Sequence, residues 1–206
     1  MDAGSQALSA RVIAANVLTC KPARTSILFL GAKRFSAFGF TPACNSFRRA
    51  IYSFNFTDVD GHTLSTSDGH VTIVVLTTPA DSEKAHTVGD RVPDYCLGNP
   101  NYRMITVLNF KRKHTGVGRK IATMLMRHRL NDEAKRLQAR YDAKKIASNA
   151  RSAVFAVADF DGTASSGLGG QPEAADFHLF VFGRNGELLQ QWNEVPSAAD
   201  LAAVVK

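Results

Sequence analysis

The sequence has few cysteines, and they form no motif. Cys20, Cys44 and Cys96 lie far apart, and none belongs to a Cys-x-x-Cys or Cys-x-x-His arrangement. Neither a disulfide framework nor a zinc site is therefore expected. The sequence also lacks an apolar run of the roughly 18 residues that a membrane-spanning helix needs, so no transmembrane segment is expected.

Acidic residues are absent from Ala3 to Thr57, where arginine, serine and alanine recur and glycine, proline and asparagine interrupt every possible helix. We predict that residues 1–51 form an N-terminal extension and that residues 52–206 form the folded domain. An acid-poor N-terminus with arginine and serine is typical of an organelle transit peptide. The extension is thus expected to be disordered or targeting-like. A cytoplasmic location is the default, with an organelle-targeted or exported form left open.

Charge is unevenly distributed along a chain of otherwise ordinary composition. The 206 residues are 45% hydrophobic and 21% charged, as in a soluble globular protein of one domain plus an extension. Residues 1–57 carry a net charge of +6 and residues 111–145 carry +9, whereas 58–110 and 146–206 carry −4 each. The basic block favours a solvated helix face, an acidic protein partner or ligand, membrane headgroups or, less strongly, nucleic acid.

The first half of the domain predicts a hairpin followed by a crossover. Residues 52–71 alternate apolar positions and contain two Asp-Gly turns, which indicates a small hairpin. The apolar run Val71–Leu76 predicts a strand buried on both faces, and Pro79 suits the first turn of a helix that must end by Pro93. A second buried strand is predicted over residues 102–110. Strand, helix and strand at this spacing indicate a right-handed crossover with parallel strands.

The second half predicts a long helix, a third strand, a hairpin and a closing helix. Apolar residues recur every three or four positions from Val117 to about Ser148, but the phase slips near Arg127–Arg129, which favours a kink or two helices. A strand is predicted over 153–160 and a loop over 161–176. Residues 177–192 predict a hairpin with a type I′ turn at Asn185-Gly186, and Ser197 is a helix cap for residues 198–205.

This order of elements resembles the thioredoxin-like superfamily, and more closely its peroxiredoxin and thiol–disulfide oxidoreductase branch. The resemblance rests on the hairpin FNFTDVDGHTLS, the crossover, the extra helix–strand unit, a D-x-D-G loop and the hairpin FVFGRNGELLQQW. It implies an α/β fold with three layers, α/β/α, around a mixed central sheet.

The resemblance also implies a site at the start of the first helix. Redox-active members carry a thiolate there, because the helix dipole lowers its pKa. In this sequence the junction reads Thr77-Thr78-Pro79-Ala80-Asp81-Ser82-Glu83-Lys84, so Asp81 and Lys84 stand at about the two cysteine positions. The family's cis-proline before the penultimate strand is also missing, since Asp176 precedes Phe177. Thr78, Asp81 and Lys84 are therefore predicted to form a degenerate site without thiol chemistry.

Two other sites are candidates. Cys96 is an alternative thiol, although its place after the first helix suggests a half-buried structural cysteine beside Asp94, which would raise the thiol pKa. The segment KRKHTGVGRK is a candidate anion site, because glycines before a helix start expose backbone amides, but it lacks P-loop spacing. Its candidate residues are Lys111, Arg112, His114, Gly116, Gly118, Arg119 and Lys120.

Three functions follow from these observations. The first is a thioredoxin-fold binding or interaction module that has lost thiol chemistry. The second is a divergent peroxiredoxin-like oxidoreductase that uses Cys96 or a partner's thiol. The third is a binder of anions or nucleic acid through residues 111–120. No cofactor is expected, and no metal site, because the six histidines are scattered and the aspartates Asp58, Asp60 and Asp68 suit turns that cap backbone amides.

Overall fold

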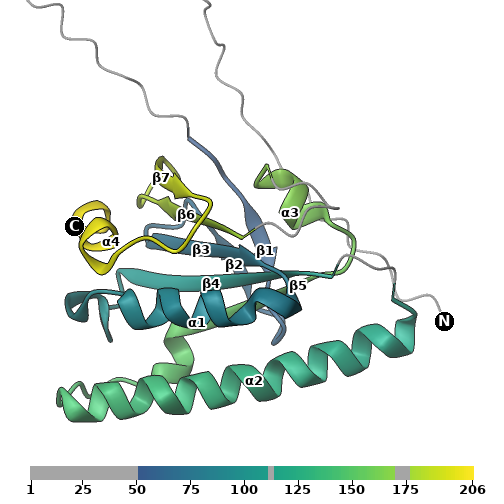
Figure 1. The fold of residues 1–206 in the computed structure, drawn as a ribbon, viewed down its shortest axis with the longest axis horizontal. Helices are drawn as coiled ribbons and strands as arrows, with labels where there is room; N and C mark the ends of the chain where they lie inside the picture. The colour runs from purple at the N-terminus through teal and green to yellow at the C-terminus, as the bar shows by residue number, and fades with distance from the viewer. Residues whose placement is uncertain (1–50, 111–113, 170–176) are drawn as a thin grey trace, which may run out of the picture.

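The computed structural model describes residues 51–110, 114–169 and 177–206 (Figure 1). Apart from Ile51, the predicted extension lies outside the described residues. Ile51 itself forms a β-bridge with Glu187. The strands are β1 (Asn55–Thr57), β2 (Thr63–Ser65), β3 (Val71–Thr77), β4 (Tyr102–Asn109), β5 (Val154–Asp159), β6 (His178–Phe182) and β7 (Leu188–Trp192). The α-helices are α1 (Ser82–Arg91), α2 (Gly116–Ala143), α3 (Thr163–Gly167) and α4 (Ala198–Val204).

Five strands form one mixed sheet in the order β5-β4-β3-β6-β7. β3, β4 and β5 run parallel, whereas β6 is antiparallel to β3, and β7 is antiparallel to β6. Both parallel connections pass through a helix, as crossovers require. This arrangement confirms the thioredoxin-like fold that the order of elements predicts.

One face of the sheet is covered by helices. Val71, Ile73 and Val75 of β3 pack against α1 and α4, and α2 packs beside them over β4 and β5. Figure 1 shows α1 and α2 on this same side of the sheet. Both lie here because each follows a parallel strand through a crossover of the same hand.

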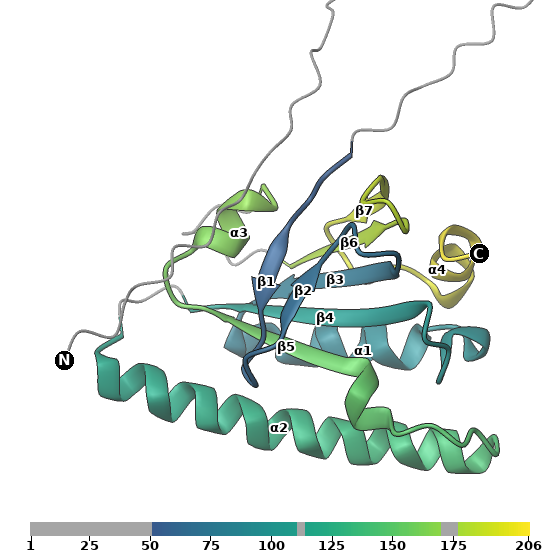
Figure 2. The ribbon, with the colours of Figure 1, turned by 180° about the vertical axis from the view of Figure 1, so that it is seen from behind.

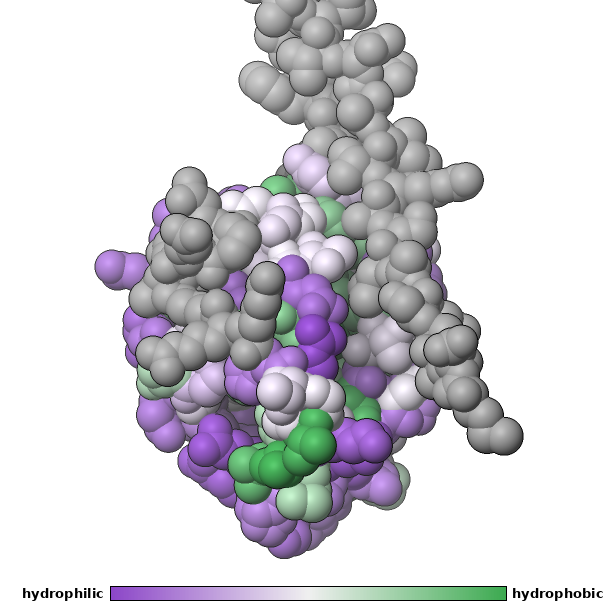
Figure 3. All heavy atoms as spheres, turned by 90° about the vertical axis from the view of Figure 1, so that its right-hand side faces the viewer, coloured by the Kyte–Doolittle hydropathy of each residue, from purple (hydrophilic) through white to green (hydrophobic). Residues whose placement is uncertain are grey.

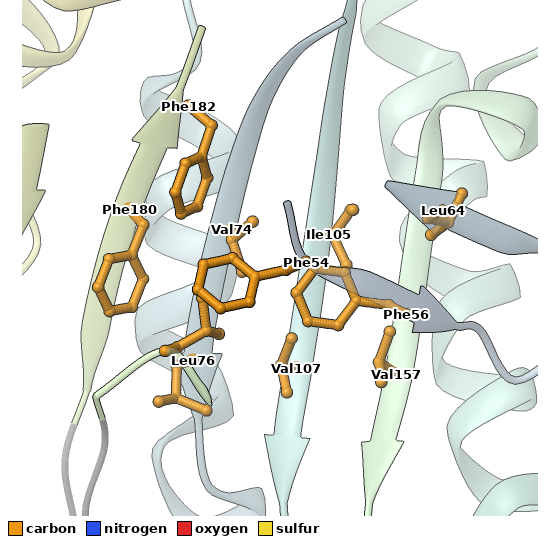
Figure 4. Packing of buried hydrophobic residues seen from close by; sticks show 11 residues of the cluster. Phe54, Phe56, Leu64, Val74, Leu76, Ile105, Val107, Val157, Phe180 and Phe182 are labelled. Atoms are coloured by element: carbon orange, nitrogen blue, oxygen red, sulfur yellow. The ribbon is translucent and has the colours of Figure 1, made fainter. Parts of the chain in front are cut away.

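The other face is covered by the β1–β2 hairpin and by α3, which complete the third layer (Figure 2). Phe54, Phe56 and Leu64 of the hairpin segment lie against sheet residues (Figure 4). The sheet residues shown in contact with them are Val74, Leu76, Ile105, Val107, Val157, Phe180 and Phe182. Since β3 alternates its side chains between the two layers, all seven of its residues are buried.

The predicted break in the long helix is wrong, because α2 is one helix of 28 residues, and Figure 1 shows it without a sharp kink. The spacing of apolar residues is irregular because the two halves of α2 carry their apolar residues on different faces of the helix. Leu130, Ala134 and Tyr141 are buried, whereas Val117 and Ile121 in the first half are exposed. Asn131-Asp132 therefore starts no second helix. Among the described residues, no helix combines the length and the apolar composition needed to cross a bilayer.

Two further local predictions are wrong. The loop predicted over 161–176 contains α3, which the buried Asp159 holds by accepting hydrogen bonds from the backbone amide (2.7 Å) and the hydroxyl (2.5 Å) of Ser165. The β6–β7 turn is not type I′, because Asn185 has no positive φ and only Gly186 does, at 81°. A type I′ turn needs a positive φ at both of its central residues. The cap of α4 is as predicted, with Ser197 Oγ accepting from the amide of Asp200.

Because the two halves of α2 carry their apolar residues on different faces, substitutions of two leucines in this helix should change the free energy of unfolding by different amounts. Leu130→Ala should lower the free energy of unfolding by about 2–3 kcal/mol, because it empties a buried position between α2 and the sheet. Leu125→Ala should change it by less than about 0.5 kcal/mol, because that side chain is 54% exposed. Urea unfolding followed by circular dichroism measures both. Equal losses would contradict the described orientation of α2.

Candidate functional site

The candidate site lies where β3 ends and α1 begins. β3 ends at Thr77, a one-turn 3₁₀ helix covers Pro79–Asp81, and α1 starts at Ser82. Pro79 fits because a first helical turn has no partner for its amide. Because β3, β4 and β5 are parallel, the carboxyl ends of β4 and β5 lie at the same end of the sheet as that of β3. Asn109 is paired with Asp159 there. The junction is thus at the sheet edge that the crossover predicts.

Asp81 lies at the N-terminal end of α1 and is held by its own neighbours. Thr78 Oγ1 donates to Asp81 Oδ2 at 3.1 Å, and Lys84 Nζ lies 3.3 Å from Asp81 Oδ1. Thr77 Oγ1 donates to the backbone carbonyl of Asp81 at 3.1 Å. The positive end of the helix dipole also favours a carboxylate at this point. Of the three predicted residues, Asp81 therefore contacts both Thr78 and Lys84.

Lys84 connects this junction to the start of β6. Its Nζ lies 5.8 Å from the ring centroid of Phe177, within cation–π range. Phe177 is buried and directly precedes β6. The structure therefore brings Lys84 of the junction next to Phe177, the residue that follows Asp176 in the sequence. Asp176 and Pro172 lie outside the described residues.

Cys96 lies at the opposite end of α1, in a 3₁₀ turn (Asp94–Cys96) before β4. It is 5% exposed and belongs to the core cluster under α1 and α4, so it is more buried than predicted. Burial raises the pKa of the Cys96 thiol to about 11. Asp94 does not add to this as predicted, because its carboxylate pairs with Lys144 (2.6 Å) and Arg140 (3.7 Å). A thiol in this state is a poor nucleophile at neutral pH.

The basic segment is described only from His114 onward, so Lys111 and Arg112 lie outside the described residues. Thr115 caps α2 by accepting from the amide of Gly118. Arg119 pairs with Asp161 at 2.6 Å and lies 5.4 Å from the ring centroid of Phe160. Arg119, one of the residues predicted to bind an anion, is therefore already paired with a carboxylate of the chain itself. Lys120 is exposed. The predicted anion site, including Gly116, stays a prediction.

A groove that the sequence did not indicate runs between α1 and α2. It holds a cavity of about 380 Å³ whose floor includes the half-buried Met104, Thr106 and Leu108 of β4. On the α1 side, Ala85 and Gly89 leave room, and a Cβ added at Gly89 would lie 4.0 Å from the Met104 sulfur. The volume falls within the range of small-molecule sites.

Charged side chains line the α2 side of the groove. His86 Nδ1 on α1 lies 2.9 Å from Glu133 Oε2 on α2, and Arg140 Nη1 donates to the Gly89 carbonyl at 3.0 Å. Arg129 and Arg136 also line it. Sequence reasoning missed this site because its residues come from several elements that are far apart in the chain. The only signal was the small pair Ala85 and Gly89, four residues apart on α1.

In the β1–β2 turn, Asp58 caps backbone amides as the sequence predicts. Asp58 accepts from the backbone amides of Asp60 (2.9 Å) and His62 (2.7 Å). Ligand atoms of Asp58, Asp60 and His62 lie within 4.8 Å of one another. Asp60 is also paired with Arg127 and Arg151. Through these contacts, the turn holds the hairpin against α2 and against the segment before β5.

No protein-family model matches the sequence, and no curated protein matches it. Solved structures with a similar arrangement include the pneumococcal exposed lipoprotein thioredoxin Etrx1 from Streptococcus pneumoniae, with 10% identity and a TM-score of 0.44, covering 74% of this chain and 97% of that one. StoA from Bacillus subtilis has 13% identity and a TM-score of 0.42, covering 76% and 98%. A secreted Mycobacterium tuberculosis disulfide oxidoreductase homologous to DsbE of E. coli has 13% identity and a TM-score of 0.40, covering 74% and 93%. With these scores below 0.5, the fold assignment rests on the strand order and crossovers described above.

The burial of Cys96 predicts slow alkylation with a steep pH dependence. In a Cys20→Ser/Cys44→Ser background, native Cys96 should react with iodoacetamide at least about 100-fold more slowly at pH 8 than the unfolded chain does. The rate should rise as the pH approaches 11, because a raised pKa keeps the thiol protonated until then. Mass spectrometry of timed samples measures the rate. Native labelling as fast as that in urea would contradict the burial of this thiol.

Proposed function

We propose that this chain is a thioredoxin-fold domain that lacks thiol–disulfide chemistry and acts as a binding module. One observation carries the proposal. The helix start at which thioredoxin-like chemistry needs a thiolate holds Asp81 instead, in contact with Thr78 and Lys84. A carboxylate suits the electrostatics of that position but cannot exchange disulfides.

The binding surface that we propose is the groove between α1 and α2. Its apolar floor on β4 suits an apolar body. On the α2 side Arg129 suits an acidic group, next to Arg136 and Arg140, which are paired with Glu133 and Asp94. The ligand class is therefore an apolar compound, or an apolar side chain of a partner, next to an acid. This matches the acidic ligand or partner favoured by the charge of residues 111–145.

One observation favours the alternative of an oxidoreductase that uses Cys96. The cysteine lines the same groove, so a small ligand bound there would lie near its sulfur. The raised pKa of the thiol weighs against this alternative, since the thiolate is the nucleophile in thiol peroxidases and reductases.

Restoring the missing nucleophile tests the proposal. Wild type and Cys96→Ser should reduce insulin disulfides and consume peroxide no faster than buffer with dithiothreitol. Asp81→Cys/Lys84→Cys should reduce insulin at least about tenfold faster than wild type, because a thiol at the α1 N-terminus has a lowered pKa.

Thr87→Cys/Asp90→Cys is the matched control, since it places the same Cys-x-x-Cys spacing at the other end of α1. It should stay near the wild-type rate, because the negative end of the helix dipole disfavours a thiolate there. Turnover by wild type that disappears in Cys96→Ser would overturn the proposal and support the oxidoreductase alternative.

Filling the groove tests the binding surface. The apolar sulfonate 8-anilinonaphthalene-1-sulfonate should bind wild type with enhanced fluorescence. Gly89→Leu should lower that fluorescence at least about fivefold, because its side chain enters the space above Met104. Thr87→Leu on the same helix should bind like wild type.

Thermal unfolding separates groove filling from a loss of structure. Gly89→Leu should unfold at the wild-type temperature or above, because glycine within a helix costs roughly 1 kcal/mol relative to alanine. A stable Gly89→Leu protein that binds the sulfonate as wild type does would show that the groove is not the binding surface.

A further inference from the structure

The first half of α2 exposes four large apolar side chains. Val117 is 69% exposed, Ile121 50%, Met124 62% and Leu125 54%. At 100° per residue, positions 117, 121, 124 and 125 fall within one sector of the helix. We call these four residues the α2 apolar stripe. Single exposed apolar residues are common on protein surfaces, but four on one helix face mark an interaction site.

The stripe lies opposite the face that α2 uses to pack on the domain. Met126 and Leu130 are buried, and helical geometry places them about 160° from the centre of the stripe. Packing within the domain therefore does not explain why the residues of the stripe are apolar. Figure 3 shows a hydrophobic patch ringed by hydrophilic residues on the side where α2 begins.

Along the helix itself, the charge beside the stripe has one sign. From Lys111 to Asn131 the sequence has seven lysines and arginines and no acidic residue. Lys120 and Arg129, both exposed, lie about 90° to either side of the stripe along the helix surface. The other arginines of this half are engaged, Arg119 with Asp161 and Arg127 with the Val59 carbonyl and Asp60. An apolar strip bordered by basic side chains is typical of helices that lie on anionic membranes.

We propose that the α2 apolar stripe docks the domain on an anionic lipid surface. The four apolar side chains enter the boundary between headgroups and acyl chains, while Lys120 contacts the lipid phosphates and carboxylates. This interaction goes beyond the groove ligand, because the stripe faces away from the domain and the groove lies beside β4.

Two properties of the stripe favour lipid over a second copy of the chain. It spans eight residue steps, about 12 Å, which is short for a protein interface of standard size. Pairing two copies would also bring basic flanks together, and like charges across an interface oppose association. A lipid surface needs no complementary shape and offers the opposite charge.

Vesicle co-sedimentation of the full chain tests the proposal. Wild type should bind phosphatidylcholine vesicles with roughly 30% phosphatidylserine at least about tenfold more strongly than pure phosphatidylcholine vesicles. Ile121→Ser/Met124→Ser should weaken that binding at least about tenfold, because it removes half of the stripe. Lys120→Glu should weaken it about fivefold or more by reversing a flanking charge.

Matched controls come from other surfaces of the domain. Ile51→Ser removes an apolar side chain that is 60% exposed, and Arg184→Glu makes the same charge change in the exposed β6–β7 turn. Both should bind like wild type. The stripe variants are exposed, so their circular dichroism and melting temperature should match those of wild type.

Each other outcome overturns the proposal. Stripe variants that bind vesicles as wild type does would assign the binding to other basic residues, including those of the N-terminal region. Sedimentation velocity that shows a dimer lost in Ile121→Ser/Met124→Ser would assign the stripe to a second copy. Stripe-dependent binding to polyglutamate but not to vesicles would assign it to an acidic protein.

Discussion

Burial of β3 on both faces is the constraint on which the rest of the structure depends. Val71, Ile73 and Val75 contribute to the core under α1 and α4, while Val74 and Leu76 contribute to the core under the hairpin. Because both faces of β3 are covered and both of its edges are paired, the strand is fixed at the centre of the sheet. The exit at Thr77 therefore determines where α1 begins, and α1 in turn determines the crossover to β4.

Under the proposed function, the fold keeps the position of a thioredoxin-like site while the side chains at that position change its chemistry. α1 still directs its N-terminus at the edge of the sheet, and the residue placed there still carries the charge that a helix N-terminus favours. Asp81, Thr78 and Lys84 satisfy one another, and Lys84 reaches Phe177 at the start of β6. Fold alone does not assign a reaction, since function depends on the groups at the site.

α2 has three faces with different surroundings. One face packs on β5 through Met126 and Leu130, and a second lines the groove with Glu133 and Arg140. The third carries the exposed apolar stripe. A helix of 28 residues can serve all three because it is longer than the strands it crosses. The small residues of α1 are equally important, since larger ones at Ala85 and Gly89 would close the groove.

Much of the fold was predictable from the sequence, because its signals are local. The apolar run Val71–Leu76, Pro79 and the spacing to residues 102–110 were sufficient for the crossover, and the order of the later elements predicted the thioredoxin-like fold. The candidate residues at the α1 junction were predictable for the same reason, since Thr78, Asp81 and Lys84 are neighbours in the chain. The contact between Lys84 and Phe177 was not, because 93 positions separate these residues in sequence.

The sequence by itself determined the strands, the order of most elements and the lack of a cysteine at the start of α1. Only the tertiary structure decided which face of α2 is buried, since apolar residues on opposite sides of one helix give the same irregular pattern as two shorter helices. Tertiary structure also decided the burial of Cys96 and the existence of the groove. Both depend on the distance between elements that are far apart in the chain, and a local pattern of residue types carries no information about that distance.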